Sequence, residues 1–295
     1  MYAGLTAALV TPLTAHGGVS GADVSRLVGI VRPHVDALLA TLSTGEGWAL
    51  TRRQWTAMVS HTVRQAGRTP VWAGLLWPHT AQVAELAREA AGLGARAVAV
   101  ATPFGRQVSQ EQMYRHYRVV SAASRLPVIV YVESAVSGNT LELGTLLRIC
   151  ALPGVAAVKD SGGSPGFTRA LIAARPGLPV LQGLEERVHD RPGTDGWVMA
   201  LANVEPALCA EVFAGRADAA RSAAGAALLR EACERHGLAR DDWYRTVKAE
   251  LHRRGVISTD VTAARDTAEA AAAADRIAVP AASSGPARTE ERSPV

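Results

Sequence analysis

Short apolar runs alternate with longer, Ala-rich segments of helical periodicity from residue 5 to residue 201. This alternation is typical of repeated βα units, in which parallel strands form an inner layer that helices cover. We predict strands at residues 5–10, 37–42, 70–75, 97–101, 127–132, 155–159, 179–183 and 196–201. This series of units predicts a (β/α)8 TIM barrel, whose active site lies at the C-terminal ends of the strands.

Helix-end signals support the pattern between the strands. Residues 80–95 begin at Thr80, an expected N-cap, and end near a glycine, and residues 109–124 begin at Ser109, another expected N-cap. Beyond the last strand the pattern becomes purely helical, which predicts a C-terminal helical extension. We therefore divide the chain into a barrel with the active site, a helical region, and a tail rich in Pro, Ser and charge that we expect to be disordered. These parts span residues 1–218, 219–277 and 278–295.

Composition and charge exclude several classes of partner. The 31 basic and 27 acidic residues are scattered, and no basic stripe is interleaved with aromatic residues, so we expect no nucleic-acid partner. Cys150, Cys209 and Cys233 fit no metal-binding spacing, which favours a reducing compartment without disulfides or zinc. The chain shows neither a signal-peptide pattern nor the ~18 apolar residues of a membrane span. We expect a cytoplasmic protein that acts on a small molecule, without metal or cofactor.

A single lysine ends one apolar run, in "GVAAVKDSGG" at residues 154–163. Burial at a strand tip favours the neutral, nucleophilic form of the amine, which makes Lys159 a candidate Schiff-base residue. The alternative is that Lys159 only ends the strand and extends its amine to water.

Two other strand ends carry groups that suit such a lysine. "STGEG" follows the second strand, where Ser43, Thr44 and the turn N–H groups could hold a small carboxylate, although the same residues also suit a helix-capping box. Tyr131 lies near the end of the fifth strand, where its hydroxyl could transfer protons or where its ring could only pack at the rim. Together with Lys159, these groups supply the nucleophile, proton relay and anchor for imine chemistry on a 2-oxo acid.

Several segments in order and spacing carry a family resemblance: "ALVTP", "STGEGWALT", "AELAREAAGLGARAVAVATPF", "PVIVYV", "GVAAVKDSGG" and "ALANVEP". The chain resembles the pyruvate-dependent class I aldolases that include dihydrodipicolinate synthase and N-acetylneuraminate lyase, from "GLTAALVTP" to "TVKAELHRRG". The resemblance implies a homodimer or homotetramer in which Lys159 forms an imine with pyruvate. It also implies that Tyr131 is the relay tyrosine and that Ser43 and Thr44 bind the pyruvate carboxylate.

Departures from the family pattern concern the second substrate. Val136 stands where the synthases of lysine biosynthesis carry an arginine for the semialdehyde carboxylate, so we do not expect true dihydrodipicolinate synthase activity. Phe104 and Gly105 replace the segment from which those synthases take a second tyrosine of a neighbouring subunit, so one link of that relay is missing.

Other features are similar to the sialic-acid-lyase branch. Glu185 and Glu186 follow the seventh strand, where that branch carries an acidic pair for substrate hydroxyls; the alternative is a solvated turn. Val198, in the last strand, is a further candidate for substrate binding. Trp48 and Trp77 lie near strand ends, and we expect them to make the acceptor pocket partly aromatic.

The sequence therefore predicts an aldolase or lyase that makes or cleaves a bond between pyruvate and an aldehyde through an imine on Lys159. One alternative is a dehydratase that uses the same imine on a 2-oxo-3-deoxy sugar acid. The other is a catalytically silent barrel with a binding or scaffold role.

Overall fold

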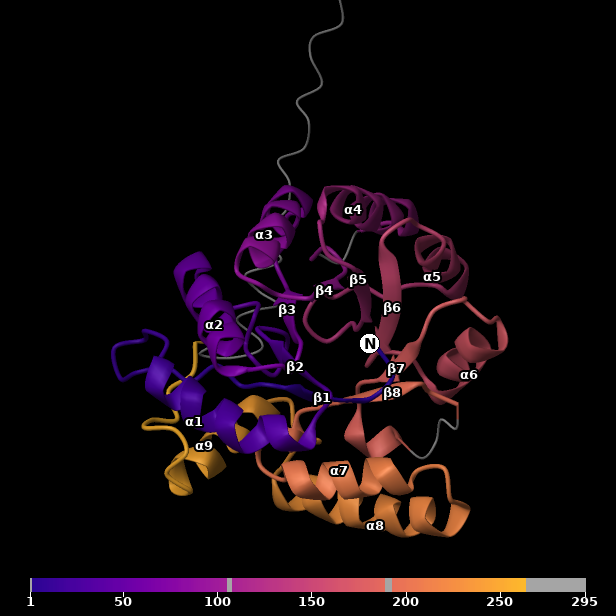
Figure 1. Ribbon diagram of the computed structural model, residues 1–295. Coiled ribbons are helices and arrows are strands. Elements are labelled where there is room, and N and C mark those ends of the chain that lie inside the picture. Colours follow the sequence, from indigo (N-terminus) through magenta and orange to yellow (C-terminus); the bar gives the residue numbers. More distant parts are fainter. Residues whose placement is uncertain (1, 105–107, 189–192, 264–295) are drawn as a thin grey trace, which may run out of the picture.

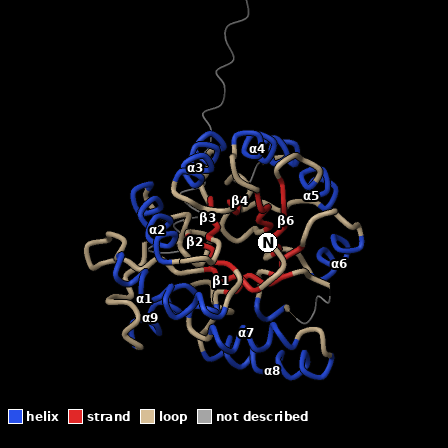
Figure 2. Tube along the Cα trace, viewed as in Figure 1, coloured by secondary structure: helices blue, strands red, loops and turns tan. Residues whose placement is uncertain are grey.

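The computed structural model describes residues 2–104, 108–188 and 193–263, which form a closed barrel of parallel strands surrounded by helices (Figures 1 and 2). The order around the barrel follows the chain from β1 to β8, and β8 pairs with β1. The strands are β1 (Leu5–Ala8), β2 (Ala37–Ala40), β3 (Val71–Leu75), β4 (Ala97–Ala101), β5 (Val128–Val132), β6 (Val155–Asp160), β7 (Val180–Gln182) and β8 (Gly196–Met199). The predicted barrel and all of its predicted strands are confirmed, because each buried apolar run could pair with its neighbours on both sides.

Helices cover the outside of the barrel, and further helices from the C-terminal part of the chain pack on it. The α-helices are α1 (Gly21–Val31), α2 (Arg52–Gln65), α3 (Thr80–Gly92), α4 (Gln110–Ala123), α5 (Leu143–Cys150), α6 (Pro165–Ala173), α7 (Pro206–Gly215), α8 (Ala219–Arg235) and α9 (Trp243–Arg253). Short 3₁₀ helices are η1 (Arg32–His34), η2 (Glu185–Arg187) and η3 (Leu201–Asn203). The last two follow β7 and β8, so they lie at the end of the barrel where the active site was predicted.

One of the two expected helix caps is correct and the other is wrong. Ser109 caps α4 in a capping box with Gln112, as expected. The N-cap of α3 is His79, whose side chain makes no capping bond. Thr80 is already helical, and its hydroxyl lies 2.9 Å from Nδ1 of His116 on the next helix, so a tertiary contact takes the group that the pattern assigned to a cap. The glycine stop is correct, since Gly94 adopts a φ of +92° just after α3.

The C-terminal helices share a hydrophobic core with the barrel. Leu229 of α8 and Val247 of α9 belong to one buried cluster with Leu5 of β1 and Leu27 of α1. The expected helical extension is therefore present, and it packs directly on the barrel. The division of the chain after residue 218 stays a prediction, and the proposed tail lies outside the described residues.

Two features bear on the environment expected for the chain. The three cysteines are free and buried. In the described part of the chain, no helix combines the length and apolar character needed to cross a membrane.

Candidate active site

A pocket of about 300 Å³ opens at the C-terminal ends of the strands. The residues predicted from the sequence that line it are Ser43, Thr44, Tyr131, Val136, Lys159, Glu185, Glu186 and Val198. The structure thus brings these eight residues to one cavity, from loops or strands that are far apart in the chain.

The strand register sets Lys159 and Tyr131 beside each other. In the parallel pair of β5 and β6, Tyr131 is the register partner of Lys159, so both side chains point to the same face of the sheet. Asp160 is the next residue and points the opposite way, where it accepts hydrogen bonds from the N–H of Gly163 at 2.8 Å and from the Thr168 hydroxyl. Alternation along β6 therefore directs the amine into the pocket and uses the neighbouring carboxylate to hold the loop before α6.

Lys159 is enclosed by the groups around it. The residue is 3 % exposed, its Nζ lies 2.6 Å from Oγ of Ser161, and Ser161 donates to the carbonyl of Gly183 at 3.2 Å. A Cβ at Gly183 would lie 2.6 Å from Nζ, so a glycine is required for the amine to sit there. Burial lowers the pKa of Lys159 to about 7, while the nearby carboxylate of Glu185 opposes this shift. The alternative, in which Lys159 extends its amine to water, is wrong.

The ring of Tyr131 contacts Lys159, and its hydroxyl contacts Ser43. The Lys159 Nζ lies 3.9 Å from the centroid of the Tyr131 ring. The hydroxyl forms a 3.0 Å hydrogen bond with Oγ of Ser43, and burial raises the pKa of Tyr131. The phenol is therefore protonated at neutral pH and can donate or pass on a proton through Ser43. Tyr131 therefore lies in the pocket with its hydroxyl hydrogen-bonded, and its role as a proton relay stays a prediction.

The turn after β2 holds Ser43 and Thr44 against the barrel. Thr41 adopts a φ of 60°, and a Cβ at Gly47 would lie 2.1 Å from the Thr41 carbonyl oxygen, so only glycine fits there. Glu46 is fully buried and forms an ion pair with Lys248 of α9. The capping-box interpretation of this motif is therefore wrong: Glu46 binds the C-terminal region, and α2 begins at its own cap, Thr51.

The loop after β5 is held by a carboxylate. Glu133 is buried, and its side chain accepts hydrogen bonds from the backbone N–H groups of Val136 at 2.9 Å and Ser137 at 3.2 Å. Burial raises the pKa of Glu133, and these hydrogen bonds oppose the shift. Val136 therefore lines the pocket with an apolar side chain on a tightly fixed loop.

The acidic pair after β7 divides into a buried and an exposed member. Glu185 is 6 % exposed and accepts a 2.9 Å hydrogen bond from the Leu201 N–H in η3, and burial raises its pKa. The solvated-turn interpretation is wrong for this residue. Glu186 is exposed and lines the pocket, so its carboxylate is available to a ligand as well as to water.

The aromatic residues of the site differ from those expected. Trp48 and Trp77 are not among the described residues that line the pocket; Trp48 packs on Tyr244 instead, with 5.5 Å between the ring centroids. Trp243, at the start of α9, does line it. Phe104 packs against the cluster inside the barrel, and Gly105 lies outside the described residues.

Sequence reasoning missed several pocket residues: Ser161, Gly183, Arg187 and Trp243. Gly183 ended a predicted strand and Ser161 stood two residues after another, so their position was a usable signal. Trp243 gave no such signal, because it lies in the helical extension and reaches the barrel only through the tertiary fold.

Comparison with known proteins shows that the chain is similar to one protein family. A model described as the dihydrodipicolinate synthetase family matches residues 1–271. A curated 4-hydroxy-tetrahydrodipicolinate synthase of Exiguobacterium sibiricum is 31 % identical over 212 residues, which cover 70 % of this chain and 72 % of that protein. The corresponding enzyme of Methylococcus capsulatus is 29 % identical over 266 residues, covering 88 % and 91 %. A crystal structure of dihydrodipicolinate synthase from Acinetobacter baumannii, complexed with pyruvate, is similar with a TM-score of 0.81 and 28 % identity, covering 94 % of this chain and 98 % of that one.

Proposed function

The chain belongs to the dihydrodipicolinate synthetase family of pyruvate-dependent class I aldolases, which are carbon–carbon lyases. On that premise we propose that it joins pyruvate to an aldehyde, or cleaves the product into the two. We further propose that the aldehyde is not aspartate semialdehyde. The observation that carries the proposal is a buried lysine amine with a pKa of about 7, beside a tyrosine and two hydroxyls in one pocket. The pyruvate that accompanies the Acinetobacter baumannii enzyme supports the choice of donor.

The first steps follow from the Lys159 amine. In its neutral form, Nζ attacks the 2-oxo carbon and forms a carbinolamine. Protonation of the carbinolamine oxygen releases water and leaves a protonated imine. Ser43 and Thr44 bind the carboxylate of the 2-oxo acid and hold the reacting carbon near Nζ.

The protonated imine then accepts electrons from the bond that breaks. In the cleavage direction, the C3–C4 pair flows toward the nitrogen, an aldehyde leaves, and the resulting enamine gains a proton at C3 before water releases pyruvate. Tyr131 moves the proton of the aldehyde oxygen, with Ser43 as the neighbouring hydroxyl. In the synthetic direction the enamine adds to the aldehyde carbon.

Val136 argues against aspartate semialdehyde as the acceptor. Its apolar side chain offers no bidentate partner for a second carboxylate, and the buried Glu133 beside it repels one. Glu185 and Glu186 instead offer carboxylate oxygens to hydroxyl groups, and Val198 supplies an apolar wall. We therefore favour an uncharged, hydroxylated aldehyde.

The test combines trapping with a product assay. Incubation with pyruvate and borohydride is expected to leave one pyruvate-derived adduct on the peptide that contains Lys159, and Lys159→Ala is expected to abolish both adduct and turnover. Lys248, the other lysine of the chain, provides an internal control, because its peptide should stay unmodified.

Products distinguish the remaining alternatives. Pyruvate with a panel of hydroxylated aldehydes is expected to condense, whereas aspartate semialdehyde is expected to give negligible product in a coupled reductase assay. A 2-oxo-3-deoxy sugar acid that loses water but keeps its carbon skeleton would show a dehydratase. An unlabelled Lys159 would contradict imine chemistry and favour a silent barrel.

We propose that the enzyme acts in the cytoplasm. We also propose that it forms at least a homodimer. The free, buried cysteines agree with a reducing compartment. The resemblance of residues 101–114 to the segment of the family that contacts a second copy supports the dimer.

A further inference from the structure

Trp243 is a pocket residue of the C-terminal extension that contacts the predicted carboxylate site. Its indole N–H lies 3.3 Å from Oγ1 of Thr44. The indole nitrogen can only donate a hydrogen bond, so Thr44 Oγ1 must be the acceptor. A hydroxyl that accepts from one side keeps its own proton for another partner.

The two hydroxyls of the carboxylate site therefore have different tasks. Ser43 is engaged with the Tyr131 hydroxyl at 3.0 Å. Thr44 is 4 % exposed and lines the pocket, so its remaining proton can point into the cavity. The indole N–H thus orients Thr44 as a donor.

The start of α9 is fixed at several points, so Trp243 does not depend on the single bond to Thr44. The Thr246 hydroxyl lies 2.8 Å from both the Trp243 and His236 carbonyl oxygens. One turn further along the helix, Lys248 forms its buried ion pair with Glu46, in the same turn that carries Thr44. The indole and its acceptor are thereby attached to one rigid unit.

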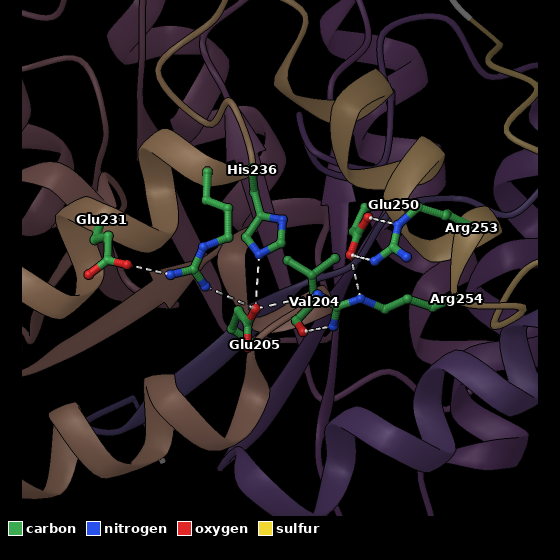
Figure 3. A network of polar contacts seen from close by, with 8 residues as sticks. Val204, Glu205, Glu231, His236, Glu250, Arg253 and Arg254 are labelled. Atoms are coloured by element: carbon green, nitrogen blue, oxygen red, sulfur yellow. Dashed lines mark hydrogen bonds and ion pairs between the residues drawn. The ribbon is translucent and has the colours of Figure 1, made fainter.

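The part of the chain from the end of α8 to the end of α9, His236 to Arg254, is also anchored on the barrel side, as Figure 3 shows. Glu205, which follows η3, lies 2.9 Å from Nε2 of His236 and 3.4 Å from Nη2 of Arg254. Arg254 also donates to the Val204 carbonyl at 2.5 Å. Both ends of the segment that carries Trp243 are therefore held to the loop after β8.

We propose that Trp243 is a positioning residue for the 2-oxo acid, whose indole N–H orients the Thr44 hydroxyl to donate to the substrate carboxylate. The inference rests on the proposed function, because it takes the carboxylate site from it. It predicts an effect on pyruvate binding that is larger than the effect on the chemical steps, since the carboxylate is bound equally before and during reaction.

The experiment measures how borohydride trapping at Lys159 depends on pyruvate concentration. Trp243→Phe keeps a ring against Trp48 and Tyr244 but removes the N–H. Because one hydrogen bond is lost, we expect the half-saturating pyruvate concentration to rise about threefold to tenfold while the maximal trapping rate changes less than twofold.

Trp48→Phe is the matched control. Trp48 belongs to the same aromatic group, and its buried Nε1 has no hydrogen-bond partner among the described residues. This variant should leave the half-saturating concentration at the wild-type value. An equal rise in both variants would show a packing effect and overturn the proposal.

A double-mutant comparison tests the route through Thr44. In a Thr44→Val background the hydroxyl is absent, so Trp243→Phe should cause no further rise. Effects that multiply would overturn the proposal, as would a Trp243→Phe variant that binds pyruvate normally. Wild-type labelling at Lys159 supports the proposed function in either case, and its absence contradicts that function, so the two failures are distinguishable.

Discussion

Lys159 is subject to two opposing influences on its amine. Burial disfavours the charged form and lowers its pKa to about 7, whereas Glu185, the largest opposing charge, favours the charged form. The balance leaves a large neutral fraction near pH 7, which is the form that attacks a carbonyl. The site therefore combines an available nucleophile with a nearby negative charge that stabilises the protonated imine.

This balance predicts the pH dependence of imine formation. The neutral fraction rises tenfold per pH unit below the pKa and levels off above it, so the initial rate of trapping with cyanoborohydride should rise with pH and level off above about 7. Glu185→Gln removes a charge that raises the lysine pKa, so its profile should shift to lower pH. Glu142→Gln, outside the pocket, serves as the control. A profile that shifts to higher pH in Glu185→Gln would contradict this electrostatic account.

Gly183 shows how a residue without a side chain serves the same amine. A Cβ there would lie 2.1 Å from Oγ of Ser161 and 2.6 Å from Nζ of Lys159. The backbone carbonyl of Gly183 also accepts from Ser161. The strand end of β7 thus provides both the space and the second hydrogen bond around the nucleophile.

At the scale of elements, α9 is part of the active-site structure. Tyr244, Val247 and Leu251 of this helix are fully buried, and Lys248 pairs with Glu46 in the turn after β2. A buried charge requires its partner, because water cannot replace it. The helix therefore stabilises the turn that carries Ser43 and Thr44, although it begins almost two hundred residues later, at Trp243.

The ion pair predicts an asymmetric mutational effect. Lys248→Met removes the cation of a buried carboxylate, and we expect a loss of about 3–5 kcal/mol in the free energy of unfolding, measured with urea. The Glu46→Gln, Lys248→Met double variant removes both charges and should recover part of that loss. A single variant as stable as the wild type, or a double variant less stable than Lys248→Met, would contradict the role given to the pair.

At the scale of the whole molecule, the barrel and its helical extension share one core. The cluster that contains Leu5 and Leu27 also contains Leu229 and Val247, so the extension buries apolar surface that the barrel helices alone would leave open. This arrangement explains how pocket residues can come from both parts of the chain.

The number of copies in the assembly can be tested by experiment. We expect at least a homodimer, so light scattering at micromolar concentration should give twice the 30.9 kDa of one chain or more. The reason is that residues 101–114 resemble the segment through which members of the family contact a second copy. A mass of one chain over the whole concentration range would contradict the expectation.

The sequence by itself determined the barrel and the main chemistry. Short apolar runs that alternate with segments of helical periodicity are typical of parallel strands covered by helices, and the strand ends then converge on one mouth. Lys159 and Tyr131 could be found in this way because each carries a reactive side chain near the end of a strand. Eight of the residues predicted for the pocket line it, whereas Trp48 and Trp77 do not.

Only the tertiary structure decided which groups meet from distant parts of the chain. Glu46 could be interpreted as a capping residue until the structure showed its ion pair with Lys248. Trp243 lines the pocket, whereas Trp48, which was expected there, does not. These outcomes depend on how α9 packs across the turn after β2, which no local pattern encodes. Periodicity reports which face of an element is buried, whereas the partner of a buried polar group depends on packing between elements far apart in sequence.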